Sequence, residues 1–378
     1  MLSSRRCRMI PGTRRDERPR PGTSRPIRVV AVDDSTFFLG ALRRALRKIP
    51  GVEVVGTASN GQQAISRIKQ LRPDVLTLDL EMPQMDGIQT LRAIKDCRLD
   101  VRVIMVSAHT AVGAEKTLEA LDLGAEDFIT KPGTSVKGDK VEYLRNQLQD
   151  KILAHAPAPP PPPMSKVKPA NRAPVLPLRP KTVQRTLARD IVVIGVSTGG
   201  PRALSEMVTG LPADFPGSIL VVQHMPPLFT TTLAQRLDKL CAMPVSEAKD
   251  GEPVRKGRVY VAPGGYHMLV GGDKRHPIIQ LNQEPRLHGC RPAADHLFLS
   301  AAKLFGARCQ GVIMTGMGND GCEGAKAVLR GGGGVIAQNE ATCAVWGMPK
   351  VAWEAGVVEE LVPLSQLAAH IVENSRIS

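Results

Sequence analysis

Residues 191–201 read IVVIGVSTGGP, an apolar run that ends in a serine on a glycine-rich turn. Residues 191–194 have the length and composition of a buried strand, and the spacing of apolar residues in 202–209 predicts a helix. A serine held on a strand-to-helix turn can act as a nucleophile. Ser197 is therefore the first candidate for a chemical role in this chain.

Strands and helices alternate on both sides of this turn. Upstream we expect strands at 27–32, 52–57, 75–78, 101–106 and 125–129, and helices at 37–49, 61–70, 88–97, 113–121 and 140–153. Downstream we expect strands at 191–194, 219–222, 258–261, 278–281, 311–314 and 334–337, and helices at 202–209, 233–240, 293–305 and 323–330. This order predicts an α/β protein: an N-terminal five-stranded doubly wound parallel sheet, then a C-terminal, mostly parallel α/β domain. Glycine pairs at 264–265 and 271–272 predict a short hairpin within the second domain.

Length and charge divide the chain further. A chain of 378 residues exceeds what one ordinary core holds, which favours two domains. The formal charge of +14 lies in residues 1–28 and 151–190, and the second segment is also rich in proline. We predict a disordered basic extension at 1–26, a domain at 27–153, a Pro-rich basic linker at 154–189 and a second domain at 190–378.

Composition argues against several classes of protein. The two predicted domains are nearly neutral and aromatic residues make up only 3% of the chain, so we expect no specific nucleic-acid partner. Seven cysteines form no C-x-x-C pair, which predicts reduced thiols and neither a zinc site nor a disulfide framework. No apolar run approaches the roughly 18 residues of a membrane span. We therefore expect a cytoplasmic protein without membrane insertion.

Charged residues cluster after the upstream strands. Asp33 and Asp34 follow the first expected strand, Asp79 the third and Lys131 the fifth, so all four should meet at the carboxyl edge of the sheet. Clustered carboxylates require a cation, and hard oxygen ligands suit Mg²⁺. Lys131 would then hold an oxygen of a phosphoryl group on a carboxylate, and Ser107 would donate its hydroxyl. Each residue alone is more often a plain polar strand end, but five together favour a phosphate-accepting site.

Four short motifs in this half match a known family. They are VDDS at 32–35, LDLEMP at 78–83, VSA at 106–108 and ITKP at 129–132, and with them the segment resembles a response-regulator receiver domain. The resemblance implies that Asp79 accepts a phosphoryl group from a phosphohistidine on a histidine kinase. It implies Mg²⁺ ligands at Asp33, Asp34, Asp79 and the backbone carbonyl of Glu81. It also implies a phosphorylation switch made of Ser107, Phe128 and Lys131.

In the downstream half, Ser197 needs a base, and the base needs an orienting group. His224 closes the expected strand before it, and Asp320 lies in the glycine-rich segment 315–321. All three residues follow strands and can meet at one sheet edge. The two glycine-rich turns can also be read as phosphate cradles, although the first lacks the P-loop lysine and neither fits G-x-G-x-x-G with a correctly placed acid. Spacing alone leaves both readings open.

A second resemblance covers residues 190–372. Its blocks are GVSTGGP at 195–201, VQHMP at 222–226, VAPGGYHM at 261–268, RPAAD at 291–295, MTGMGNDG at 314–321 and WGMP at 346–349. With these blocks the segment is similar to the catalytic domain of the chemotaxis protein-glutamate methylesterases. The resemblance implies a serine nucleophile, its general base, the orienting acid and two residues near the oxyanion, which are Ser197, His224, Asp320, Thr198 and Met317. No cofactor is implied for the ester reaction.

The two resemblances together imply a phosphorylation-regulated hydrolase in chemotactic adaptation. It would remove methyl esters from glutamate side chains of chemoreceptors, deamidate receptor glutamines, and be recruited to chemoreceptor arrays with the chemotaxis histidine kinase as phosphodonor. The alternative is a response regulator whose output is non-catalytic binding. Its support is the basic character of residues 1–28 and 151–190. A glycine-rich α/β output domain is, however, a poor reader of DNA grooves.

Overall fold

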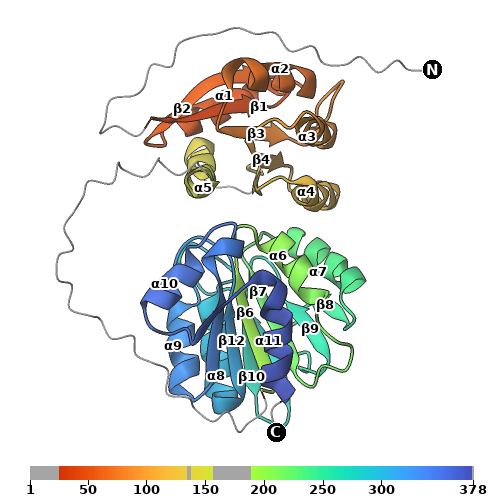
Figure 1. The fold of residues 1–378 in the computed structure, drawn as a ribbon, viewed down its shortest axis with the longest axis vertical. Coiled ribbons are helices and arrows are strands. Elements are labelled where there is room, and N and C mark those ends of the chain that lie inside the picture. The colour runs from red at the N-terminus through yellow and green to blue at the C-terminus, as the bar shows by residue number, and fades with distance from the viewer. Residues whose placement is uncertain (1–24, 134–137, 156–188, 377–378) are drawn as a thin grey trace, which may run out of the picture.

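The computed structural model describes residues 25–133, 138–155 and 189–376. Most of the predicted basic extension (1–26) and most of the predicted linker (154–189) lie outside these ranges. The described chain forms two α/β bodies, each built on its own parallel sheet: an N-terminal body up to residue 155 and a C-terminal body from residue 189 (Figure 1). In the described ranges, no helix has both the length and the apolar character needed to cross a membrane.

The N-terminal body contains a five-stranded sheet in the order β2-β1-β3-β4-β5. All its pairings are parallel. Its strands are β1 (Ile27–Val32), β2 (Val52–Ala58), β3 (Val75–Asp79), β4 (Arg102–Ser107) and β5 (Asp127–Thr130). Its helices are α1 (Thr36–Arg47), α2 (Gly61–Leu71), α3 (Gly87–Asp96), α4 (Ala111–Leu123) and α5 (Lys140–His155). The predicted five-stranded doubly wound fold is confirmed.

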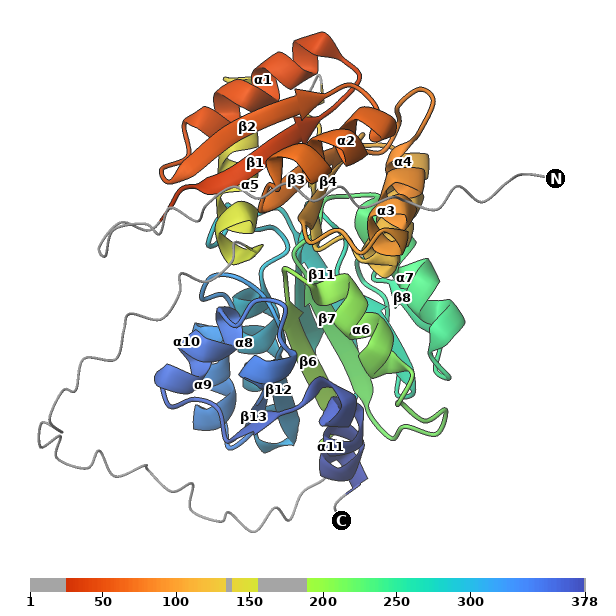
Figure 2. The same cartoon turned by 45° about the horizontal axis from the view of Figure 1, so that its top comes forward.

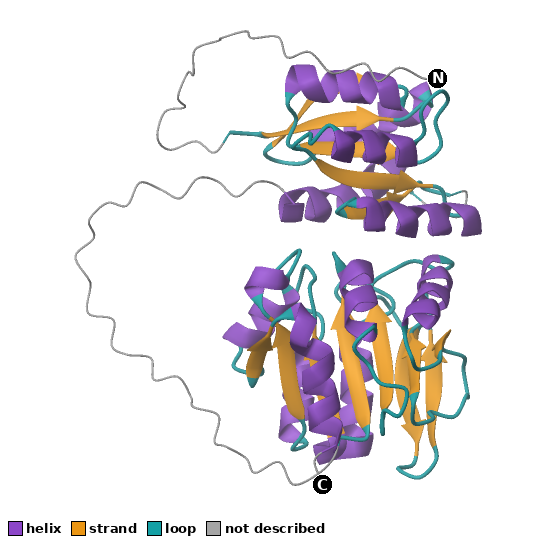
Figure 3. Ribbon diagram, turned by 45° about the vertical axis from the view of Figure 1, so that its right-hand side comes forward, coloured by secondary structure: helices purple, strands orange, loops and turns teal. Residues whose placement is uncertain are grey.

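The two faces of this sheet follow from strand alternation, because successive side chains of a strand point to opposite faces. In β1, Val29 and Ala31 pack with α1 and α5, whereas Val30 and Val32 pack with the helices of the other face, α2, α3 and α4. Figure 3 shows helices on both sides of the strands in each body. The carboxyl ends of the strands are therefore the part of the sheet left open to a site.

Polar side chains fix where the helices of the N-terminal body begin. The Ser35 hydroxyl accepts a hydrogen bond from the Phe38 N–H at the start of α1. Asp86 and Gln89 form a capping box at the start of α3, in which each side chain accepts from the other residue's backbone N–H. Such caps satisfy N–H groups that lack a partner within the helix. They end the strand-to-helix loops at defined points and thus set the geometry of the sheet edge.

The C-terminal body contains a seven-stranded parallel sheet in the order β14-β13-β12-β6-β7-β9-β8. Its strands are β6 (Ile191–Val196), β7 (Ser218–Gln223), β8 (Val245–Glu247), β9 (Arg258–Val261), β12 (Cys309–Ile313), β13 (Gly334–Gln338) and β14 (Glu360–Val362). Its helices are α6 (Gly200–Val208), α7 (Phe229–Leu240), α8 (Ala294–Phe305), α9 (Cys322–Arg330), α10 (Met348–Glu354) and α11 (Leu364–Arg376), with short 3₁₀ helices η1 (Gly306–Arg308) and η2 (Glu340–Thr342).

A separate antiparallel hairpin of β10 (His267–Gly272) and β11 (Pro277–Asn282) accompanies the main sheet. The predicted hairpin is confirmed, and the strand expected at 278–281 belongs to it. The sequence analysis misses β8 and β14 because strands of three residues carry almost no periodicity. It also misses α10 and α11, so the C-terminal body contains more elements than the pattern predicts.

The strand order places residue 197 at a crevice. Strand β6 pairs with β7 on one side and with β12 on the other, so the strand order reverses beside β6. Open α/β sheets bind ligands at the carboxyl ends of strands where the strand order reverses in this way. Ser197 is the residue that directly follows β6.

The two bodies touch through the helices that flank this crevice. Helix α4 packs against α6 and α7 (Figure 2). The Phe128 ring of β5 stacks on the Phe229 ring of α7, with centroids 4.7 Å apart and planes inclined by 10°. An ion pair joins Asp122 of α4 to Arg236 of α7. Apolar and charged contacts thus both hold the N-terminal body over the carboxyl edge of the C-terminal sheet.

Candidate functional sites

Three aspartates meet at the carboxyl edge of the N-terminal sheet, as predicted. Asp33, Asp34 and Asp79 each offer a carboxylate oxygen, and these oxygens lie within 4.8 Å of one another. Asp33 and Asp79 are buried, whereas Asp34 is exposed. The Lys131 Nζ lies 2.7 Å from Asp33 Oδ2 and 2.8 Å from Asp79 Oδ2. Several carboxylate oxygens with an open side fit a small hard cation such as Mg²⁺.

The charges in this pocket are unbalanced. Burial and then the negative charge of Asp33 raise the pKa of Asp79 to about 6, although Lys131 acts in the opposite direction. Burial alone would lower the pKa of Lys131, but hydrogen bonds to Asp33 and Asp79 outweigh it and raise that pKa. One ammonium therefore does not compensate three carboxylates. A divalent cation would, which agrees with the chemistry of the donor set.

The side chains of the residues expected to form the switch have different partners, although the Lys131 N–H donates to the Ser107 carbonyl at 2.8 Å. The buried Ser107 hydroxyl donates to the Gly113 carbonyl at 3.2 Å and accepts from the Thr117 hydroxyl at 2.8 Å, so it is bonded to α4. Phe128 faces α7 of the C-terminal body. Glu81 is exposed in the loop after β3, and its carboxylate lies 3.4 Å from Lys116 Nζ. In this structure only Lys131 of the expected switch contacts the aspartates.

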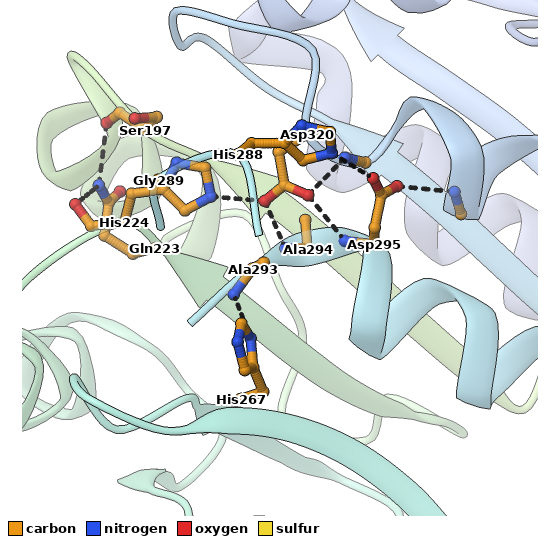
Figure 4. A network of polar contacts seen from close by, with 12 residues as sticks. Ser197, Gln223, His224, His267, His288, Gly289, Ala293, Ala294, Asp295 and Asp320 are labelled. Carbon is orange, nitrogen blue, oxygen red and sulfur yellow. Dashed lines mark hydrogen bonds and ion pairs between the residues drawn. The ribbon is translucent and has the colours of Figure 1, made fainter. Parts of the chain in front are cut away.

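A second site lies at the carboxyl edge of the C-terminal sheet. Ser197 follows β6, His224 follows β7 and Asp320 lies in the loop between β12 and α9. His224 Nε2 lies 2.7 Å from Asp320 Oδ2 (Figure 4). Figure 4 shows Ser197 beside Gln223 and His224. The topology thus brings together the three residues that the sequence analysis selects.

Asp320 is held by backbone as well as by His224. Its carboxylate accepts from the backbone N–H of Ala294 at 2.6 Å, of Asp295 at 2.9 Å and of Gly321 at 2.9 Å. Burial would raise the pKa of Asp320, but the bonds to His224 and to these N–H groups outweigh it and lower the pKa. Asp320 is therefore a fixed carboxylate that stays ionised next to the imidazole.

The imidazole responds to this carboxylate. Burial alone would lower the pKa of His224, but hydrogen bonds to Asp320 and to the Cys290 thiol outweigh it and raise the pKa to about 10. Because Nε2 is bonded to Asp320, Nδ1 is the ring nitrogen that is not engaged by this carboxylate. The pair has the arrangement of a base with its orienting acid.

The backbone around Ser197 is held from three directions. Ser197 N–H donates to the Thr315 carbonyl at 3.0 Å, while the Ser197 carbonyl accepts from Gly200 N–H at 2.8 Å and from Gln223 Nε2 at 2.9 Å. A Cβ on Gly200 would lie 1.9 Å from Gln223 Oε1, so a larger residue there would displace the Gln223 side chain. Among the hydrogen bonds of the described residues, none joins Ser197 Oγ to His224. Rotation of the serine side chain has to complete that contact.

Two further residues expected near an oxyanion are also at this edge. Thr198 is buried and its carbonyl accepts from the Thr315 hydroxyl at 3.0 Å. Met317 lies in the loop after β12, where a Cβ on Gly316 would come within 2.7 Å of Ser197 Cβ. In the part of the chain described here, the N–H groups of Thr198 and Met317 donate no hydrogen bond.

The second site opens onto a small cavity between the two bodies. Its volume is about 130 Å³, below the roughly 300 Å³ at which small-molecule sites usually begin. Residues of the C-terminal body line one side, namely Ser197, Thr198, Pro201, Gln223, His224 and Pro226. Residues of β5 and α5 line the other, namely Asp127, Phe128, Thr130, Gln147 and Lys151. In this arrangement the N-terminal body covers Ser197.

Sequence reasoning missed residues that support the site rather than form it. Gln223 holds the Ser197 carbonyl, and Asp295 lies beside Asp320. Both residues stand in the sequence blocks VQHMP and RPAAD, so a signal was present. Their roles depend on hydrogen bonds between separate elements, which a linear pattern does not contain.

Both bodies match known families. Residues 29–139 match the response regulator receiver domain and residues 192–371 match the CheB methylesterase family, so the class is a response regulator joined to a methylesterase domain. A protein-glutamate methylesterase/protein-glutamine glutaminase of Symbiobacterium thermophilum is 47% identical, over 91% of this chain and 96% of its own length. One of Pyrococcus abyssi is 43% identical, over 93% of this chain and 94% of its own length. The crystal structure of the Thermotoga maritima CheB methylesterase catalytic domain is 42% identical, covers 50% of this chain and 99% of that chain, and has a TM-score of 0.48. This chain belongs to the protein-glutamate methylesterase/protein-glutamine glutaminase family, which confirms the predicted resemblance.

Proposed function

We propose that this protein is a phosphorylation-regulated esterase that hydrolyses glutamate methyl esters of chemoreceptors and deamidates their glutamines. The names of the relatives support the activity. The observation that carries it is the 2.7 Å contact of His224 with Asp320, at the same sheet edge and in the same cavity as Ser197. We propose 27–153 and 190–378 as its two domains, cytoplasmic chemoreceptor arrays as its place of action, and no cofactor for the ester reaction.

The reaction is an acyl transfer in two steps. His224 Nδ1 takes the proton of Ser197 Oγ, which attacks the ester carbonyl carbon. The N–H groups of Thr198 and Met317 stabilise the oxyanion, and His224 returns the proton as methanol leaves. Water then attacks the acyl-serine with His224 again as base, which releases the glutamate carboxylate and restores Ser197. With a glutamine side chain the same sequence releases ammonia.

Asp320 contributes by orientation and charge. Its bond to Nε2 fixes the tautomer that leaves Nδ1 free to accept a proton, and its negative charge stabilises the imidazolium formed during attack. The carboxylate itself does not move, because three backbone N–H groups hold it. Gln223 holds the Ser197 carbonyl and thereby the nucleophile's backbone.

The aspartate cluster is the regulatory input. We assign Asp79 as phosphoacceptor, with a histidine kinase of the chemotaxis system as donor. Asp33, Asp34, Asp79 and the Glu81 carbonyl would hold Mg²⁺, which when bound supplies positive charge to the phosphoryl oxygens. Lys131 Nζ already lies 2.8 Å from Asp79 Oδ2 and would hold another of these oxygens.

Regulation follows from the cover over Ser197. When Asp79 is phosphorylated, the Ser107 hydroxyl would leave its bonds to α4 for the phosphoryl group, and Phe128 would leave Phe229. The first change weakens the attachment of α4 to β4, and the second removes a contact between β5 and α7. Such a switch requires contacts that differ between the two states, and these bonds supply them.

An electrophilic serine probe tests the enzyme assignment against a non-catalytic binding output. The full-length protein should be labelled at Ser197, faster with a phosphodonor present, and Ser197→Ala should stay unlabelled. Mass spectrometry of peptides locates the label. Ser246 of β8, which is partly exposed, serves as the reference for unspecific reaction. Labelling at Ser197 no faster than at Ser246 in the phosphorylated protein would contradict an activated nucleophile.

A further inference from the structure

A second carboxylate is buried beside Asp320. Asp295 stands in the first turn of α8 and is nearly inaccessible to solvent. Its carboxylate, that of Asp320 and a ring nitrogen of His288 offer atoms within 4.8 Å of one another. In the mechanism above Asp295 touches no reacting atom. A buried carboxylate next to another one is costly, so its presence needs an explanation.

The two acids cap each other's helices. Asp320 precedes α9 and accepts from the N–H groups of Ala294 and Asp295 at the start of α8, at 2.6 Å and 2.9 Å. In return Asp295 Oδ1 accepts from Gly324 N–H in the first turn of α9 at 2.7 Å. Each helix N-terminus therefore receives the carboxylate that the other segment carries (Figure 4). Both carboxylates lie at the positive end of a helix dipole, where negative charge is favoured.

This reciprocal cap requires α8 and α9 to lie close together. A Cβ on Gly324 would lie 2.3 Å from Phe298 Cβ, so glycine permits the approach. The loop that carries Asp320 leads directly into α9. If α9 moved away from α8, the Asp320 carboxylate would move away from His224 with it.

His288 completes the arrangement from the solvent side. Its Nε2 lies 3.0 Å from Asp295 Oδ2, and its side chain is partly exposed. Burial and the charge of Asp320 raise the pKa of Asp295, while Gly324 N–H and His288 act in the opposite direction. Asp295 thus has a partner for each oxygen, one from α9 and one from the loop before α8.

We propose that Asp295 is a positioning residue for ester hydrolysis: by holding α9 on α8 it fixes the Asp320 carboxylate against His224. The activity part of this inference rests on the proposed function. The geometric part does not, because the state of the His224–Asp320 bond can be observed directly. Asp295 acts through Asp320 and does not contact substrate.

Two substitutions separate the hydrogen bond from the charge. Asp295→Ala removes the acceptor for Gly324 N–H, whereas Asp295→Asn keeps a carbonyl oxygen there. Asp238→Asn is the matched control, since Asp238 also accepts a backbone N–H, that of Val245 at 2.7 Å, but lies on α7 away from the site. The full-length variants are compared by methanol release from methylated receptor membranes with acetyl phosphate present. The ring proton of His224 is followed by ¹H NMR.

We expect Asp295→Ala to lower kcat on the order of 10- to 100-fold with KM nearly unchanged, because small misplacements of a catalytic group cost about that much. Its His224 ring-proton signal should shift or broaden. Asp295→Asn should keep most of the wild-type kcat and a His224 signal close to that of the wild type. Asp238→Asn should match the wild type in both quantities. An unmoved His224 signal with wild-type kcat in Asp295→Ala would overturn the proposal. So would Asp295→Asn being as impaired as the alanine variant.

The two readouts separate the proposals. If the wild type releases no methanol, the proposed function fails, while a His224 signal that moves only in Asp295→Ala still supports the positioning role. If Asp295→Ala does not fold, the comparison of Asp295→Asn with Asp238→Asn tests the positioning role instead. A displaced His224 signal and a kcat as low as about a hundredth of wild type in Asp295→Asn would then contradict it.

Discussion

At the scale of residues, His224 is central to the proposed reaction, because its protonation state decides whether it can accept the proton of Ser197. Hydrogen bonds to Asp320 and to the Cys290 thiol outweigh burial and raise its pKa to about 10, which favours the protonated imidazole at neutral pH. A protonated ring cannot accept the serine proton. The neutral fraction grows as the pH rises toward that pKa, and the rate should grow with it.

This gives a prediction about pH. For the wild type, kcat/KM for methanol release should rise with pH along a limb set by His224. In Asp320→Asn the charge that raises the pKa of His224 is gone, so the limb should lie at lower pH. The maximal rate of Asp320→Asn should fall by about 10⁴, as when the orienting acid of such a triad is replaced. Identical limbs in the two proteins would show that His224 is not the titrating base.

Sequence reasoning selected the three candidate residues, which the structure brings together, but not the residues that support them. Ser197, His224 and Asp320 could be selected because each follows a predicted strand and stands in a recognisable block. The mutual capping of α8 and α9 through Asp295 and Asp320 could not be predicted. It depends on backbone N–H groups of separate helices, and a linear motif does not specify which residues lie next to them.

At the scale of elements, the proposed control of access rests on the contact of α4 and β5 of the N-terminal body with α7 of the C-terminal body. The Phe128–Phe229 stack is worth about 0.5–1.5 kcal/mol beyond the area it buries. The partly exposed Asp122–Arg236 ion pair adds less, about 0.2–1 kcal/mol. The sum of small contacts suits a switch, since a strong interface would not open on phosphorylation.

Removal of the ion pair should loosen the cover. Without phosphodonor, Asp122→Ala should release methanol up to about fivefold faster than the wild type, which corresponds to about 1 kcal/mol of lost contact. Glu119→Ala is the matched control on the same helix, because Glu119 pairs with Arg92 inside the N-terminal body at 3.1 Å. If both variants show the same basal rate, the α4–α7 contact does not restrain the enzyme.

The elements themselves were largely predictable, whereas their contact was not. All five strands of the N-terminal sheet and its helices follow from the alternation of apolar strand and helix patterns. Strands β8 and β14 escaped because of their length. The packing of α4 on α7 joins segments about a hundred residues apart in sequence and depends on tertiary structure alone.

At the scale of the whole molecule, an acid pocket built around Asp79 and a covered hydrolase site around Ser197 lie on two sheets of one chain. The cavity of about 130 Å³ over Ser197 leaves no room for a receptor helix. A helix with its side chains is about 10 Å across. Under the proposed function, the described arrangement is the resting state, and substrate binding requires the N-terminal body to move away.

The most direct test is methanol release from methylated receptor membranes by the full-length protein, with and without a phosphodonor. Asp79→Asn and Ser197→Ala are measured alongside the wild type. The account predicts that the donor accelerates the wild type, that Asp79→Asn keeps only its basal rate, and that Ser197→Ala is inactive under both conditions. If the wild type releases no more methanol than Ser197→Ala, the hydrolase assignment is contradicted. If Asp79→Asn responds to the donor as the wild type does, the assignment of the phosphoacceptor is wrong.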